Sequence, residues 1–299
     1  MAFRNLILES KAYLSLKNGQ LVVRTDSEHT LPVEDLSAIL LENRQSTVTT
    51  AALSYLGQCG CTVFFCDEKH MPCAVLTPFH QHSRMLAVMQ SQLDAALPLK
   101  KRLWQSIVQQ KIRNQALCLE YAGLPEKSEA LFRLAERVRS GDTENIEAQA
   151  AQLYFPALFG QGFTRGSEDG RNAGLNYGYA ILRGCIARAL AAYGFLPALG
   201  LHHRSTLNAF NLADDLIEPF RPVVDLLVVH LLTPEDTLEA QYRRTLFNCL
   251  NLDVLSGQQH HSLSYAVERE VQSLGRSFEA KEARLLLPKL LESAQHEYE

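Results

Sequence analysis

The sequence lacks both a long apolar segment and a disulfide framework. The apolar run of residues 226–229 stops at His230 and falls far short of the roughly 20 residues that a membrane-spanning helix requires. Seven cysteines, an odd number scattered from Cys59 to Cys249 in 299 residues, do not match the dense pairing of small secreted proteins. The opening residues, MAFRNLILES, contain no apolar signal core. We therefore expect a protein of the reducing cytoplasm with no membrane segment.

The chain also carries little net charge, which limits how it can meet a nucleic acid. Its formal net charge is −4 at pH 7, and its isoelectric point is near 6.2. The field of the whole molecule therefore does not attract phosphate, and any contact with nucleic acid must use a local basic patch. The sequence contains no internal repeat and no low-complexity tract, which excludes repeat and fibrous architectures.

The first quarter of the sequence has the pattern of a β-rich domain. A content of 46% hydrophobic and 21% charged residues can bury a full core, and the length favours two domains over one. Residues 3–76 contain short runs with strand-like alternation separated by turn signals. The pair Asn18-Gly19 between two such runs predicts a tight hairpin. Helical spacing within residues 49–60 predicts one helix. We expect residues 1–76 to form this domain.

A polar segment, TPFHQHSR at residues 77–84, predicts a linker, after which the strand pattern does not return. From Met85 onward the apolar residues recur with helical spacing. The predicted helices cover 85–97, 99–121, 126–139, 143–159, 170–193, 207–218, 222–232, 235–251 and a last pair after Ser262. The expected fold class is therefore α+β, with an N-terminal β-rich domain followed by a larger all-α domain over residues 85–299.

The stretch PALGLHHRSTLNAFNLADDLIEPFRPVVD concentrates imidazole, carboxylate and guanidinium groups. A helix is predicted over 207–218, and Pro219 ends it because proline cannot continue the hydrogen-bond ladder. Helical spacing places Asn211, Asp214 and Glu218 on one strip, where stacked carboxylates repel each other unless a cation lies between them.

His203 lies in the loop before this helix, from which it can reach the acidic strip. Together they would form a mixed nitrogen and oxygen site for a divalent metal. The alternative interpretation is a solvated acidic face with two ordinary loop histidines, His202 and His203, and the strip alone does not separate the two.

A second carboxylate comes from the segment NIEAQAAQLYFPALF. Asp142 or Thr143 can cap its helix, and Glu147, Ala151 and Tyr154 then fall on one side. The small side chain of Ala151 lets another helix or a DNA backbone approach the glutamate closely, and Tyr154 adds a hydroxyl one turn further on.

The segment between these two pieces is rich in alanine and glycine and predicts a helix inside a bundle. Gly174, Gly178 and Gly184 permit close packing at some cost in helix propensity. Such a helix can bring Glu147 and His203 back into one pocket.

Basic residues flank the predicted metal strip. The predicted helix over 99–121 is rich in lysine and arginine, and most such helices simply expose a basic face to solvent. The arginines that follow it in the sequence cluster around the strip rather than spreading evenly, which favours contact with phosphate. The residues expected to contact DNA phosphates are Lys100, Lys101, Arg165, Arg204 and Arg221.

Three segments together resemble one protein family: EAQAAQLYF from Glu147, LNYGYAILR from Leu175, and GLHHRSTLNAFNLADDLIEPFRPVVD from Gly200. They are similar to the CRISPR-associated integrase Cas1, in the compact form found in type II systems. The resemblance covers nearly the whole chain, and the block around His203 and Glu218 is its most specific part. The β-rich front region, with CDEKHMP before the linker, also resembles that family.

The resemblance implies an N-terminal β domain that mediates homodimerisation and a C-terminal helical domain that is catalytic. It also implies assembly with the small Cas2 protein into a complex that inserts new spacers of double-stranded DNA into a CRISPR array.

Carried over by motif, the metal-binding residues, which are also the catalytic ones, are Glu147, His203 of the Gly-x-x-His motif, and Glu218 before Phe-Arg-Pro. Asp214, His202 and Tyr154 are candidates for orienting these ligands, and whether Asp214 is itself a ligand stays open. The implied cofactor is Mg²⁺ or Mn²⁺, since carboxylates hold either ion and an imidazole makes Mn²⁺ acceptable.

Two other functions remain compatible with the same residues. A metal-dependent nuclease of branched or single-stranded DNA would use water in place of the DNA 3′-hydroxyl. A catalytically silent scaffold would bind DNA and partner chains, with Glu147, His203 and Glu218 serving only as structural residues.

Overall fold

The computed structural model describes residues 4–78 and 83–296. Its chain divides into two compact units, the first ending at Ser83 and the second beginning at Arg84. The fold class expected from the sequence, a β-rich region followed by a mainly helical domain, is confirmed. Residues 79–82 of the predicted linker lie outside the described residues.

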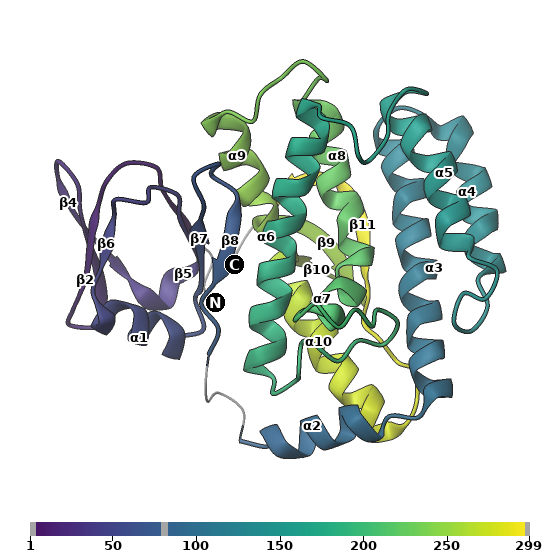
Figure 1. The fold of residues 1–299 in the computed structure, drawn as a ribbon, viewed down its shortest axis with the longest axis horizontal. Helices are drawn as coiled ribbons and strands as arrows, with labels where there is room; N and C mark the ends of the chain where they lie inside the picture. The colour runs from purple at the N-terminus through teal and green to yellow at the C-terminus, as the bar shows by residue number, and fades with distance from the viewer. Residues whose placement is uncertain (1–3, 79–82, 297–299) are drawn as a thin grey trace. The chain divides into compact units, whose positions relative to one another are not determined.

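The first unit contains two four-stranded sheets (Figure 1). One sheet has the order β1-β5-β7-β8, with β1, β5 and β7 parallel and β8 antiparallel to β7. The other has the order β4-β3-β2-β6, antiparallel except for the parallel pair β2 and β6. The strands are β1 Arg4–Leu8, β2 Tyr13–Lys17, β3 Gln20–Arg24, β4 Glu28–Pro32, β5 Leu36–Leu41, β6 Thr47–Val48, β7 Thr62–Cys66 and β8 Pro72–Val75.

Local sequence explains the connections of this unit. The predicted hairpin joins β2 to β3, and Asn18 and Gly19 both adopt positive φ angles of 51° and 73°, as such a turn demands. The predicted helix is α1 Thr50–Gln58, and the Thr49 side chain caps it by accepting from the Ala52 N–H at 3.3 Å. Helix α1 contacts β2 of one sheet and β7 of the other and so closes the core between them.

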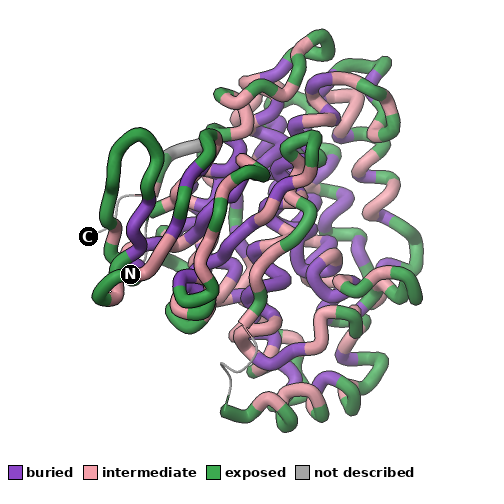
Figure 2. The backbone as a smooth tube through the Cα atoms, turned by 60° about the vertical axis from the view of Figure 1, so that its left-hand side comes forward, coloured by how far each residue is buried: buried purple, intermediate pink, exposed green. Residues whose placement is uncertain are grey.

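The second unit is built around two long helices, α3 Leu97–Tyr121 and α6 Gly170–Ala192. Buried residues recur along both helices (Figure 2). Helix α8 contacts both of them, and α4 and α5 pack on α3 (Figure 1). The other helices are α2 Met85–Asp94, α4 Pro125–Arg137, α5 Ile146–Phe159, α7 Asn211–Leu216, α8 Arg221–Leu231, α9 Ala240–Phe247 and α10 Leu263–Ala280, with 3-10 turns η1 Val33–Asp35 in the first unit, η2 Glu218–Phe220 and η3 Asn248–Asn251.

Glycines let α6 approach α8 closely, as the sequence predicts. A Cβ atom added at Gly178 would lie 2.4 Å from Val224 Cγ1, and one added at Gly174 would lie 2.4 Å from Leu232 Cδ1. Because real Cβ contacts are essentially never this short, each glycine sets the distance between the two helices.

The expectation that no strand follows residue 84 is wrong. Three strands, β9 Leu252–Ser256, β10 Gln259–Ser262 and β11 Pro288–Gln295, form an antiparallel sheet of order β10-β9-β11 in the second unit. Strand β9 alternates between buried and partly buried positions, a period of two that is short enough to be absorbed into the neighbouring helical pattern. Pro288 is tolerated because it begins an edge strand.

The predicted helix over 207–218 is also shorter in the structure, because asparagine side chains compete for the backbone. The Asn208 amide oxygen accepts from the Phe210 N–H, and Asn211 donates to the carbonyls of Ala198, Ser205 and Asn208. A loop therefore persists until α7 begins at Asn211.

Candidate metal and DNA site

Glu147 and Glu218 are brought to a common point by a lysine of the long central helix. Glu147 lies in the first turn of α5, and Glu218 opens η2. The ammonium Nζ of Lys111, in the middle of α3, lies 2.6 Å from Glu147 Oε1 and 2.5 Å from Glu218 Oε2. Both predicted carboxylate ligands therefore meet at one buried positive charge.

The start of α5 shows why Glu147 is held in place. The Asp142 carboxylate accepts from the Ile146 N–H at 2.8 Å and from the Glu147 N–H at 3.0 Å, and so satisfies the free donors of the first turn. Asp142, one of the two residues predicted to cap this helix, therefore accepts from its first turn, although the residue at the N-cap position is Asn145.

Glu218 is ionised in spite of its burial. Burial alone would raise its pKa, but the Lys111 ammonium and the Arg221 guanidinium, whose Nε lies 3.0 Å from Glu218 Oε1, outweigh that effect. The pKa of Glu218 falls from 4.5 to about 2. The carboxylate is therefore available as an anionic ligand throughout the neutral range.

His203 is positioned by Asp215, a residue that sequence reasoning missed. The fully buried Asp215 carboxylate lies 2.7 Å from His203 Nδ1 and accepts from the backbone N–H groups of Leu201, His202 and His203. With Nδ1 bound to the carboxylate, Nε2 of His203 is left for a ligand. The hydrogen bond to Asp215 outweighs burial and raises the pKa of His203.

The Gly-x-x-His spacing has a steric reason. A Cβ atom at Gly200 would lie 2.4 Å from the carbonyl oxygen of His203 and 2.7 Å from Asp215 Oδ2. Only glycine lets the loop fold back onto the carboxylate at this point. In the sequence Asp215 stands next to Asp214, and both aspartates have helical spacing to Glu218, so spacing alone did not select Asp215.

The acidic strip predicted from Asn211, Asp214 and Glu218 does not form. Asp214 turns instead to Arg183, whose Nε lies 2.6 Å from Asp214 Oδ1, and it also accepts from the Asn208 side chain at 2.6 Å. The Asn211 side chain donates instead to backbone carbonyls of the preceding loop. The interruption of the helix before Asn211 and the 3-10 turn at Glu218 change the angular spacing on which the prediction depended.

The His202 and His203 rings both contact Trp104 but meet it in different orientations. The His202 ring stacks on the buried Trp104 ring with centroids 4.3 Å apart and an angle of 4° between the planes. The His203 ring meets Trp104 edge-on at 5.7 Å, and the two imidazoles are nearly perpendicular, at 89°. Of the two rings, it is that of His203 that bonds to Asp215.

A small polar cavity of about 140 Å³ adjoins Lys111 and Glu218. Tyr179, Arg165 and Asp225 are also among its lining residues. The Tyr154 and Tyr179 hydroxyls donate to the Asp225 carboxylate at 2.9 and 2.5 Å, so the Tyr154 hydroxyl bonds to Asp225.

The carboxyl of Asp225 behaves differently from that of Glu218 beside it. Burial raises the pKa of Asp225 to about 6, although the hydroxyl donors of Tyr179 and Tyr154 oppose the shift. Two residues that line the cavity therefore carry carboxyl groups of different acidity: Glu218, with a pKa of about 2, and Asp225, with a pKa of about 6.

The predicted DNA contacts fall into two groups. Arg165 and Arg221 line the 140 Å³ cavity, where their guanidinium groups lie 5.3 and 4.4 Å from the centre of the Tyr179 ring. Burial and the positive charge of Arg204 lower the pKa of Lys100. Lys101 is exposed in the first turns of α3 and packs its stem over Gly141.

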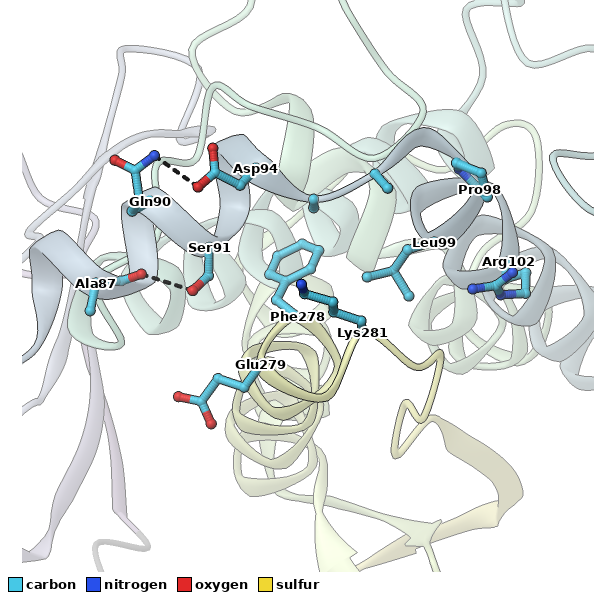
Figure 3. A pocket seen from close by; sticks show the side chains of 12 residues that line it. Ala87, Gln90, Ser91, Asp94, Pro98, Leu99, Arg102, Phe278, Glu279 and Lys281 are labelled. Atoms are coloured by element: carbon cyan, nitrogen blue, oxygen red, sulfur yellow. Dashed lines mark hydrogen bonds between the residues drawn. The ribbon is translucent and has the colours of Figure 1, made fainter.

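A larger cavity of about 530 Å³ lies elsewhere in this unit, between α2, the start of α3 and the end of α10 (Figure 3). Phe278 and Lys281 from the end of α10 face Ser91 and Leu99 across it. None of the predicted site residues lines this cavity.

The donor set fits a divalent cation in kind. Two carboxylates and an imidazole with Nε2 directed away from its Asp215 bond are suitable ligands for Mg²⁺ or Mn²⁺. Within residues 4–78 and 83–296, no three His, Cys, Asp or Glu side chains are close enough together to hold a metal. The positive charge that contacts both glutamates in this structure is the ammonium group of Lys111.

The protein therefore consists of a β-rich unit and a helical unit. The helical unit carries two glutamates and a histidine that are suited to bind a metal, with basic residues beside them. The family model described as CRISPR associated protein Cas1 matches residues 6–251. The chain belongs to the Cas1 family, and the resemblance drawn from the sequence is confirmed.

Curated relatives match over much or all of their length. The chain is 44% identical to the CRISPR-associated endonuclease Cas1 of Neisseria meningitidis serogroup C, over 100% of both chains. It is 29% identical to a CRISPR-associated endonuclease Cas1 of Francisella tularensis subsp. novicida, over 76% of this chain and 78% of that protein.

Solved structures share the fold at low sequence identity. A casposase bound to integration product has a TM-score of 0.76 and 18% identity, and the match covers 94% of this chain and 92% of that one. A Cas1 protein from Thermotoga maritima has a TM-score of 0.73 and 17% identity, covering 94% of this chain and 99% of that one.

Among the described residues, no helix combines the length and apolar character needed to cross a membrane.

Proposed function

We propose that this protein is the metal-dependent DNA integrase of CRISPR adaptation, which inserts spacer DNA into a CRISPR array. In this reaction the 3′-hydroxyl oxygen of the spacer DNA forms a bond to the phosphorus of a phosphodiester in the array, and the bond from that phosphorus to the 3′-oxygen of the array strand breaks, which leaves a new 3′-hydroxyl. The observation that carries the proposal is the convergence of Glu147 and Glu218 on one positive charge in a Cas1-family chain whose His203 is fixed by Asp215.

The proposed cofactor is Mg²⁺ or Mn²⁺, held by Glu147, Glu218 and Nε2 of His203. When bound, the cation would neutralise charge on the phosphoryl oxygens. Asp215 keeps the His203 ring in one orientation and one tautomer, and the depressed pKa of Glu218 keeps that ligand anionic. Because the attacking hydroxyl belongs to the DNA, the protein needs no nucleophile of its own.

Arg165 and Arg221, and the pair Lys100 and Arg204, are suited to contact phosphates and position two DNA segments without reading sequence. The proposed substrate is double-stranded DNA. The casposase that shares this fold is bound to an integration product, which supports DNA joining as a reaction for this fold.

We propose Cas2 as the partner and a homodimer as the basic assembly, in a cytoplasmic complex. One chain of a Cas6-RT-Cas1–Cas2 complex shares this fold, with a TM-score of 0.71 and 20% identity over 97% of this chain and 36% of that one. The β-rich unit is the proposed dimerisation domain, because an antiparallel sheet can leave a face for a second copy.

The test is a strand-joining assay with purified protein, its Cas2 partner, labelled spacer DNA and a CRISPR array. Joined product should appear with Mg²⁺ or Mn²⁺ and disappear with EDTA. A nuclease, which the name endonuclease of the curated relatives favours, would give cut strands without joined ones. A silent scaffold, favoured by the contact of Lys111 with both glutamates, would bind DNA equally with and without metal.

A further inference from the structure

Lys111 is the positive group at the centre of the candidate metal site. Its side chain is only 10% exposed, and it is carried by the middle of α3 among buried apolar residues. Its ammonium contacts Oε1 of Glu147 at 2.6 Å and Oε2 of Glu218 at 2.5 Å. Buried ammonium groups are retained where they are paired, and this one has two carboxylates.

The charges around this point are balanced without a metal. Lys111, Arg165 and Arg221 are cationic. Glu147 and Glu218 are anionic, and so is Asp225 at a pH above its pKa of about 6, so the six groups sum to zero at neutral pH. Asp215 is engaged by His203 and by backbone N–H groups, and it adds no free charge at the glutamates. A divalent cation added to this arrangement would leave an excess of two positive charges in a poorly solvated place.

We propose that Lys111 is an internal counter-cation that occupies the carboxylates of Glu147 and Glu218 before metal binds and competes with the divalent cation for them. The inference rests on the proposed function, in which these carboxylates hold the metal. Lys111 thereby sets the concentration of Mg²⁺ or Mn²⁺ at which the site fills. The long methylene chain of lysine lets the ammonium withdraw while α3 stays in place.

The experiment measures Mn²⁺ binding to the full-length protein without DNA, from the decrease of the paramagnetic resonance signal of free Mn²⁺. Lys111→Met removes the charge and keeps most of the side-chain volume. Lys111→Arg keeps the charge, and Lys127→Met, at an exposed position of α4, is the matched control.

Lys111→Met should bind Mn²⁺ about 5- to 150-fold more tightly than wild type, the usual range for coupling between two binding events. Lys127→Met should bind as wild type does, and Lys111→Arg should bind far less tightly than Lys111→Met. In EDTA, Lys111→Met should unfold at a lower temperature than wild type because its two carboxylates repel each other, and Mn²⁺ should raise its melting temperature more than that of wild type.

Unchanged or weaker Mn²⁺ binding by Lys111→Met, with wild type still binding, would overturn the inference and leave the proposed function intact. That result would mean that Lys111 positions the two carboxylates or contacts a DNA phosphate, rather than competing with the metal. An absence of Mn²⁺ binding in wild type and Lys111→Met alike would overturn both. If Lys111→Met does not fold, Lys111→Met/Glu147→Gln removes one charge of each sign, and it should bind Mn²⁺ at least as tightly as Glu147→Gln alone.

Discussion

His203 and the two glutamates reach the candidate metal site with different kinds of support. His203 is held by Asp215, which also binds three backbone N–H groups of the same loop, and none of these contacts depends on a metal. Glu147 and Glu218 come from separate elements and meet at the side chain of Lys111. The imidazole is therefore preorganised by backbone geometry, whereas the carboxylates are held together by a side-chain cation.

The largest expected effect separates the two neighbouring histidines. His203→Ala removes the only nitrogen ligand of the proposed site and should abolish metal-dependent strand joining, while DNA binding through phosphate contacts persists. His202→Ala removes the ring stacked on Trp104 and should reduce joining by at most about 10- to 100-fold, the usual cost of losing a group that orients a ligand. Joining rates across a Mn²⁺ titration provide the measurement. Retained activity in His203→Ala with full loss in His202→Ala would show that the wrong imidazole has been chosen.

Asp215→Ala tests whether Asp215 holds the His203 loop in place. It leaves three backbone donors and one imidazole without their acceptor and should lower the free energy of unfolding by about 3 to 5 kcal/mol. Urea unfolding followed by circular dichroism measures this loss. In Asp215→Asn, NMR titration should find the pKa of His203 shifted down toward its ordinary value, because Asp215 is what raises it. A change below about 1 kcal/mol in Asp215→Ala would remove Asp215 from this role.

Acid should destabilise the protein by protonating Glu218. The pKa of Glu218 is about 2 in the folded protein against 4.5 when unperturbed, so its contribution to stability is complete above about pH 4.5 and is lost as the pH falls through 2. The expected loss is about 3 kcal/mol, and Glu218→Gln should flatten the stability profile in that window.

Asp225 should give the opposite slope at higher pH. Its pKa of about 6 exceeds the ordinary 3.8, so the folded state keeps a proton that the unfolded state has lost, and stability falls as the pH rises between these values. Comparing Glu218→Gln with Asp225→Asn over roughly pH 2 to 7 by chemical unfolding isolates the two slopes. Identical profiles for wild type and both variants would contradict the assigned ionisation states.

The smallest expected effect concerns Asp214. Arg183 and Asp214 form a partly exposed ion pair, with side chains 39% and 21% exposed, so Arg183→Met should cost about 0.2 to 1 kcal/mol. Asp214→Asn should leave Mn²⁺ affinity nearly unchanged if Asp214 is not a ligand. A loss of affinity similar to that of Glu218→Gln, measured by paramagnetic resonance, would make Asp214 a ligand.

Sequence periodicity predicted the elements better than it predicted the partners within the site. The Asn18-Gly19 hairpin, the glycine contacts of α6 and the capping by Asp142 depend on local rules that a sequence displays directly. Asp215 and Asp214 are adjacent, and which of them faces His203 depends on where the helix begins. That boundary is set by Asn208 and Asn211 side chains bonding to the loop backbone, which residue spacing alone does not reveal.

Lys111 was missed for a different reason. In the sequence it belongs to a basic helix, and it lies 36 residues from Glu147 and more than a hundred from Glu218. Its burial follows from the packing of α5, η2 and α8 on α3, a tertiary arrangement rather than a local pattern. Strand β11 was missed likewise, because it joins β9 across the whole length of α10.

The contact between Trp104 and both imidazoles makes the protein its own optical probe. The chain contains a single tryptophan, so all of its indole emission arises from this place. One histidine ring lies flat on the indole and the other meets its edge, and a cationic imidazole quenches indole fluorescence when the two are in contact. Protonation of His203, rearrangement of the loop and arrival of a paramagnetic ion would each change the emission of the unlabelled protein, and a stopped-flow fluorimeter can follow these events in time.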